Sequence, residues 1–147
     1  MGCSKTLCDI IPKIIGILYI ILFVYAATSK LLAIEQFKFQ LEKSPFISAY
    51  ADWMVWIIPL TELSIVALFL YKKYLLAAFY SSFMLMTLFT IYIFLVLNFS
   101  DDVPCACGGI ISTLGWRAHF VFNMGFMLLG LIGIITTLKQ RNFTIPK

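Results

Sequence analysis

Long, nearly unbroken runs of apolar residues dominate the chain and occur four times. They cover approximately residues 14–33, 53–71, 75–97 and 120–138. Each run approaches the ~20 apolar residues that an α-helix needs to cross a hydrocarbon layer about 30 Å thick. A membrane barrel would instead show shorter segments in which apolar and polar residues alternate. The pattern therefore predicts four transmembrane helices.

Composition supports this interpretation and limits what else the chain can contain. Of its 147 residues, 62% are hydrophobic and 12% are charged, whereas a soluble domain is roughly half apolar and about a quarter charged. Almost nothing remains outside the four runs to form a soluble domain. The first run is too long for a cleavable signal peptide and lacks a cleavage motif. We therefore predict an all-α integral membrane protein, with residues 1–147 forming one four-transmembrane-helix bundle.

The basic residues predict how this bundle lies in the membrane. Four spans place both termini on one side, and most of the eleven basic residues fall on that side: Lys5, Lys13, Lys72, Lys73, Lys139, Arg141 and Lys147. The positive-inside rule then makes that side cytoplasmic, an N-in/C-in bundle in a bacterial inner membrane. The net charge of +4 is an orientation signal, so we expect the lipid bilayer and no nucleic acid as a partner.

The first outer connection reads "EQFKFQLEKSPFISAYAD". Its apolar residues Phe37 and Leu41 alternate with charged residues, and a proline disfavours helix at the residue before it. We expect a short interfacial helix that ends before Pro45.

The second outer connection, "DDVPCACGG", carries the residues most suggestive of chemistry. Cys105 and Cys107 lie on the face that we expect to be oxidising, where a thiol pair can form a disulfide. Cysteines two apart close a small, strained ring, and strained exposed disulfides exchange readily. The positive end of the following helix, with Arg117, favours a thiolate nearby. Redox exchange is the interpretation that we favour.

Two other interpretations of the pair stay open. The disulfide could only stabilise the loop, or the pair could be half of a metal site completed by His119 and Asp101 or Asp102. Zinc ligands typically follow C-x(2–4)-C spacing, which this chain lacks, so we predict no metal. Cys3 and Cys8 fall on the reducing cytoplasmic side, and we expect them to be inert.

Glu62 places a carboxylate near the middle of the second apolar run. Such a charge costs about 2.5–3.5 kcal/mol on insertion scales unless it is neutralised or paired inside the bundle. Lys30, at the outer end of the first helix, is the expected partner in a buried ion pair. A structural pair and a proton-handling role both remain open.

Polar and small residues on the last two helices suggest packing and a supporting role. His119 and Asn123 share one helix face, where they could accept a thiol proton, bind a quinone-like carbonyl or simply join helices. Gly130 and Gly133 predict close helix packing. We expect hydrogen bonds between helices from four hydroxyl residues: Ser81, Ser82, Thr87 and Thr90.

Three sequence segments resemble a known family. "ATSKLL" and "PLTELSIVALFL" resemble the DoxX-like membrane proteins, and "PCACGG…W..H..FN" is similar to forms from Bacteroidetes in the MauE branch, named for methylamine utilisation. The resemblance covers nearly all four helices. It implies a part in forming or maintaining disulfides of envelope proteins beside a thioredoxin-like partner. The residues of this chain to which the resemblance extends a functional role are Lys30, Glu62, Cys105 and Cys107.

The architecture also resembles vitamin K epoxide reductase-type bundles, which pass electrons from thiols to a quinone. Those proteins have C-x-x-C and commonly a second cysteine pair on the same side, whereas this chain has C-x-C and no second outer pair. The sequence therefore assigns no cofactor, and a quinone is only a conjecture. Two functions remain: a component of a thiol–disulfide oxidoreductase system, or a non-catalytic subunit of a larger envelope membrane complex.

Overall fold

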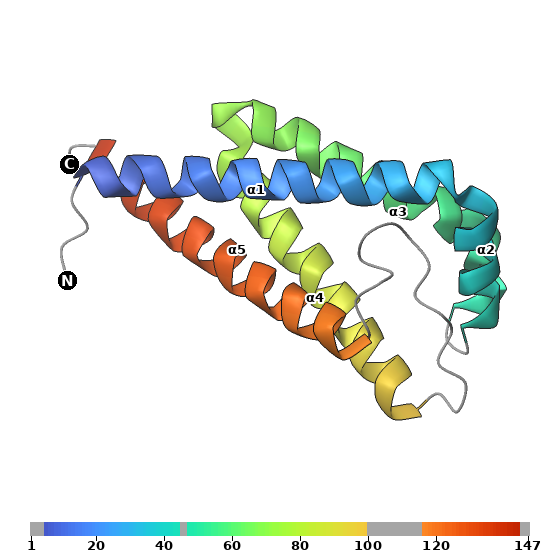
Figure 1. The fold of residues 1–147 in the computed structure, drawn as a ribbon. Helices are drawn as coiled ribbons and strands as arrows, with labels where there is room; N and C mark the ends of the chain where they lie inside the picture. Colours follow the sequence, from blue (N-terminus) through green and yellow to red (C-terminus); the bar gives the residue numbers. More distant parts are fainter. Residues whose placement is uncertain (1–4, 45–46, 100–115, 145–147) are drawn as a thin grey trace.

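The computed structural model describes residues 5–44, 47–99 and 116–144, which are almost entirely helical. Figure 1 shows the α-helices of these ranges: α1 (Lys5–Leu32), α2 (Ile34–Lys43), α3 (Ala51–Leu70), α4 (Leu75–Phe99) and α5 (Trp116–Thr144). The short 3-10 helices η1 (Ser48–Tyr50) and η2 (Lys72–Tyr74) precede α3 and α4. No strand occurs within these ranges.

Four of the helices, α1, α3, α4 and α5, are long and apolar enough to cross a membrane, which confirms the predicted fold class. Two of them extend well beyond their apolar runs. α1 begins at Lys5 rather than near residue 14, and α5 runs from Trp116 to Thr144 rather than over 120–138. Hydropathy marks only the part of a helix that lipid surrounds, whereas backbone hydrogen bonds continue the helix into its polar flanks.

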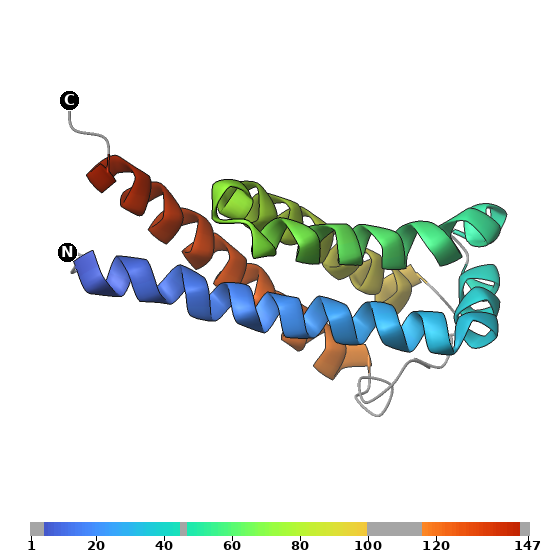
Figure 2. The ribbon, with the colours of Figure 1, turned by 90° about the horizontal axis from the view of Figure 1, so that it is seen from above.

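Both ends of the described chain lie at the same end of the bundle. The start of α1 lies beside the end of α5 (Figure 1), where Gln140 Nε2 donates a 2.9 Å hydrogen bond to Asp9 Oδ1. The opposite end carries α2, which lies across the end of α1, as Figure 2 shows from above. Tyr92 joins α4 to this end, because its hydroxyl donates to Ser44 Oγ at 3.0 Å. We call this opposite end the α2 end.

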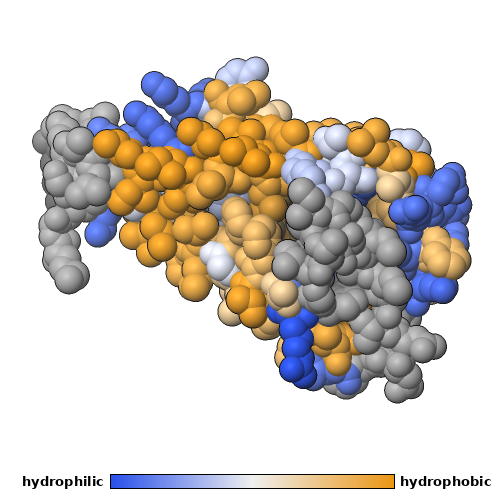
Figure 3. Space-filling model, viewed as in Figure 1, coloured by the Kyte–Doolittle hydropathy of each residue, from blue (hydrophilic) through white to orange (hydrophobic). Residues whose placement is uncertain are grey.

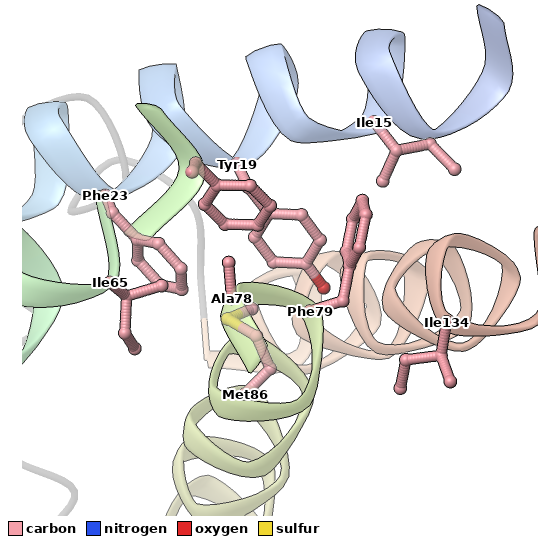
Figure 4. Close-up of a cluster of buried hydrophobic side chains, with 9 residues drawn as sticks. Ile15, Tyr19, Phe23, Ile65, Ala78, Phe79, Met86 and Ile134 are labelled. Atoms are coloured by element: carbon pink, nitrogen blue, oxygen red, sulfur yellow. The ribbon is translucent and has the colours of Figure 1, made fainter. Parts of the chain in front are cut away.

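The central cluster of the bundle is built around Tyr19 (Figure 4). All four membrane helices contribute buried side chains to it: Ile15, Tyr19, Phe23, Ile65, Phe69, Ala78, Phe79, Met86 and Ile134. The Tyr19 ring lies 5.8 Å from the Phe69 ring and 5.5 Å from the Phe126 ring, centroid to centroid. The Tyr19 hydroxyl donates a 2.6 Å hydrogen bond to the Phe126 carbonyl. A buried tyrosine thus adds a polar link between α1 and α5 to its apolar contacts.

Two glycines let α5 approach its neighbours, which confirms the predicted close packing. A Cβ at Gly130 would lie 2.7 Å from the Tyr19 hydroxyl, and one at Gly133 would lie 2.5 Å from the Phe79 ring. A Cβ at Gly125, on the same helix, would have no described residue of a neighbouring helix within 4 Å. Small residues allow this close contact between membrane helices.

The face of the bundle in Figure 3 exposes apolar side chains over a broad area. Within the apolar window of each span, 28–33% of the residues are buried in the protein. The other residues of these windows are not buried in the protein and require apolar surroundings, as expected for helices in lipid. Trp53 and Trp56, 73% and 54% exposed, lie in the first turns of α3 at the α2 end, where an aromatic belt would lie.

Helix α2 is the short helix that the sequence predicts before Pro45. Its Leu41 packs on Ala51 and Val55 of α3, and we call these three buried residues the end cluster. On its outer side, Lys38 Nζ lies 2.7 Å from Asp52 Oδ1. The hydrogen bond and negative charge of Asp52 raise the pKa of Lys38.

Candidate functional site: a charged layer inside the bundle

Cys105 and Cys107 lie outside the described residues, together with Asp101 and Asp102. They fall in the chain segment that leads from the end of α4, at Phe99, to the start of α5, at Trp116. Arg117 is exposed in the first turn of α5. The predicted contribution of Arg117 and the helix end to a thiolate therefore stays a prediction.

Lys30 and Glu62 form the ion pair that the sequence predicts between the first two membrane helices. Lys30 Nζ on α1 lies 2.7 Å from Glu62 Oε1 on α3. The side chain of Glu62 is 0% exposed and that of Lys30 is 21% exposed. A buried carboxylate thus has a counter-charge at hydrogen-bonding distance, which the low dielectric of its surroundings requires.

The helix geometry explains how Lys30 reaches inward from the end of α1. Side chains on an α-helix lean toward its N-terminus, so a lysine in the last turn of α1 leans back into the bundle. Its Nζ accordingly also donates to the carbonyl of Ala26, one turn earlier, at 3.3 Å. The rings of Phe37 and Phe89 have their centroids 5.9 Å from the same nitrogen. The ammonium group is therefore enclosed by a carboxylate, a carbonyl and two aromatic faces.

On α5, Asn123 is buried, with 3% of its surface exposed, and His119 is half-buried one turn earlier. The structure thus brings Lys30 and Glu62 together, and it places His119 in the first turn of α5. The proposed roles of His119 and Asn123 remain predictions.

The hydroxyl groups of α4 differ from what the sequence predicts. Ser82 and Thr90 donate to carbonyls of their own helix, Ala78 at 2.8 Å and Met86 at 2.7 Å. For these two residues the predicted bond between helices is wrong, because the carbonyl four residues earlier is the nearest acceptor in an apolar setting. Thr87 also contacts α5, since its hydroxyl lies 3.4 Å from Met127 Sδ.

Sequence reasoning missed two features of this interior. It did not identify the Tyr19–Phe126 link, although a tyrosine inside an aliphatic span signals a hydroxyl that needs a partner. It also missed the rings of Phe37 and Phe89 beside Lys30, for which phenylalanine-rich helices give no distinguishing signal. Within the described ranges, no group of three His, Cys, Asp or Glu side chains could hold a metal ion.

A bundle of four membrane-crossing helices that encloses an ion pair defines a small multi-pass membrane protein. Residues 8–136 match the family model described as methylamine utilisation protein MauE. This match covers most of the chain, which belongs to the MauE family. No curated protein and no solved structure matches the chain. The matched range includes Lys30, Glu62, Cys105, Cys107 and His119.

Proposed function

We propose that this MauE-family membrane protein supports thiol–disulfide exchange of envelope proteins through Cys105 and Cys107. The observation that carries the proposal is the position of the C-x-C pair in the chain, shortly before a membrane-crossing helix. Membership in the MauE family supports an accessory role in a membrane-associated process.

The exchange has a defined direction of attack. A thiolate of a soluble, thioredoxin-like partner attacks Cys105 Sγ, the Cys105–Cys107 bond breaks, and the electron pair leaves on Cys107 Sγ. Cys107 is nearer in sequence to Arg117 and the start of α5, which favour its thiolate and make it the better leaving group. The second partner thiol then attacks the mixed disulfide and releases reduced Cys105. The partner leaves as a disulfide, and the pair has gained two electrons.

The proposal includes a location and an electron acceptor. The N-in/C-in orientation expected from the lysines places the pair on the outer face of a bacterial inner membrane. We also propose that the chain is related to the DoxX-like membrane proteins, which its first two membrane helices resemble in sequence. Reoxidation of the pair requires a two-electron acceptor, for which a membrane quinone is the conjecture.

A second function has its own support in the structure. The buried charges of Lys30 and Glu62 are paired with each other, as they would be in a scaffold without chemistry of its own. In that case the protein is an accessory subunit of a larger membrane complex, and its disulfide only stabilises the loop.

Trapping of the mixed disulfide separates the two functions. In cells, Cys107→Ser should accumulate a disulfide-linked adduct with a soluble envelope protein. A reductant should cleave this adduct. Cys105→Ser is the matched control and should accumulate much less. The absence of an adduct from both variants, with full function in the Cys105→Ser/Cys107→Ser double variant, would leave the accessory subunit.

A further inference from the structure

The apolar interior of the bundle is interrupted between two clusters. The central cluster reaches Ile65 on α3, and the end cluster reaches Val55 on the same helix. Between these residues, the buried positions of α3 are Pro59 and Glu62. The break in the apolar interior therefore coincides with the ion pair.

Each membrane helix contributes a polar residue toward the α2 end of the central cluster. These residues are Lys30, Glu62, Thr90 and Asn123, and we call them the polar layer. The register of α4 against α5 places Thr90 and Asn123 at the same level along the bundle. Thr87 contacts Met127, and the Phe94 and Phe120 rings lie 6.5 Å apart, so in this antiparallel pair Thr90 lies opposite the turn of Asn123.

Two atoms of the polar layer are buried without a hydrogen-bond partner among the residues that the structure describes. They are the second carboxylate oxygen of Glu62, Oε2, and the amide nitrogen of Asn123, Nδ2. Buried side-chain polar atoms are normally hydrogen-bonded, and an exception calls for a specific reason. Of these two atoms, Glu62 Oε2 is an acceptor and Asn123 Nδ2 is a donor. Together they suit a molecule that both donates and accepts a hydrogen bond.

The charges and neighbours of the polar layer restrict the class of that molecule. Lys30 and Glu62 neutralise each other, so a charged guest would bring an uncompensated charge into a low dielectric. Phe89 lies beside the Lys30 ammonium, and the Phe122 and Phe126 rings on α5 contact each other in a tilted arrangement, with centroids 4.9 Å apart. Aromatic neighbours favour a flat ring in offset or edge contact.

We propose that the polar layer binds a small uncharged aromatic molecule that carries a phenol-type hydroxyl and a second oxygen. The hydroxyl donates to Glu62 Oε2, and the second oxygen accepts from Asn123 Nδ2. Lys30, with a side chain that is 21% exposed, and half-buried His119, one turn before Asn123, are less buried than Glu62 and Asn123. This site does not depend on Cys105 or Cys107 and goes beyond the proposed exchange function.

Two probes of nearly the same shape test the site. The full-length protein in detergent or nanodiscs is titrated with 4-methoxyphenol, which has one donor and one further oxygen. The same titration uses 1,4-dimethoxybenzene, which has no donor. We expect 4-methoxyphenol to raise the thermal unfolding midpoint saturably, while 1,4-dimethoxybenzene does not. Equal effects of the two probes, or no saturable effect, would overturn the proposal without any variant.

The variant Asn123→Leu removes the unpartnered donor and keeps the number and branching of the side-chain heavy atoms. It should weaken 4-methoxyphenol binding about 3- to 10-fold, the factor that corresponds to one net hydrogen bond. Ser82→Ala is the matched control, because Ser82 is also fully buried but bonds only to its own helix in the described contacts. The control should bind like the wild type. Unchanged binding by Asn123→Leu would show that the amide is not part of a ligand site.

Discussion

The ion pair between Lys30 and Glu62 is open to a quantitative test by a double-mutant cycle. Glu62→Gln keeps the shape of the side chain but leaves the Lys30 ammonium without a counter-charge. Breaking a fully buried pair costs about 3–5 kcal/mol. Lys30 is 21% exposed and retains its bond to the Ala26 carbonyl. Because the lysine can move partly toward water, we expect a smaller loss of about 2–3 kcal/mol in the free energy of unfolding.

Lys30→Met in the same chain should recover part of that loss, because it removes the unmatched ammonium and leaves an apolar side chain beside Phe37 and Phe89. The cycle of wild type, two single variants and double variant is measured by unfolding in mixed micelles of increasing denaturing-detergent content. Tryptophan fluorescence reports the transition. Residues in direct contact typically show coupling of about 0.5–3 kcal/mol, and we expect a value toward the upper end.

Lys38→Met is the control for this cycle. Its pair with Asp52 has the same 2.7 Å separation, but the two side chains are 40% and 78% exposed. The free energy of unfolding should therefore change little, since exposed pairs are weak. The reasoning is refuted if Lys30→Met and Glu62→Gln combine additively, or if Lys38→Met is as destabilising as Lys30→Met.

Three further predictions concern packing, the Tyr19 link and topology. Gly133→Ala should destabilise the bundle by about 1–3 kcal/mol, because its Cβ would lie 2.5 Å from the Phe79 ring. Gly125→Ala meets no described atom within 4 Å and should be neutral or stabilising by up to about 1 kcal/mol. Equal effects of the two variants in the same unfolding assay would contradict the packing. Tyr19→Phe should cost about 0.5–1.5 kcal/mol by removing the hydrogen bond to the Phe126 carbonyl, and an unchanged unfolding free energy would argue against that bond. In intact, reduced cells, a membrane-impermeant thiol reagent should label Cys105 or Cys107 but neither Cys3 nor Cys8, and the opposite pattern would overturn the proposed orientation.

The sequence predicted the four membrane helices because an apolar run of this length has few alternatives in lipid. It also predicted the Lys30–Glu62 contact, since a carboxylate inside an apolar run needs a counter-charge and Lys30 was the suitably placed cation. The packing roles of Gly130 and Gly133 followed from their place on one helix.

Other features depend on three-dimensional register, which hydropathy does not contain. Nothing in the residue types tells that the Tyr19 hydroxyl meets the Phe126 carbonyl or that Phe89 lies beside Lys30. The hydroxyls of Ser82 and Thr90 satisfy themselves within α4, an outcome open to any serine or threonine on a helix. The role of Cys105 and Cys107 depends on their reactivity. The C-x-C spacing alone favours redox exchange but does not determine how reactive the two thiols are.

The reduction potential of the Cys105–Cys107 pair tests the proposed exchange function most directly. The purified protein is equilibrated with glutathione buffers of defined potential, and the fraction of disulfide is counted by thiol alkylation and mass analysis, with Cys3→Ser/Cys8→Ser as the background. Structural disulfides of secreted proteins typically lie below about −300 mV. Our account predicts a reversible intramolecular disulfide with a potential well above that value. A potential below it, or the absence of a disulfide between the two cysteines, would contradict the account.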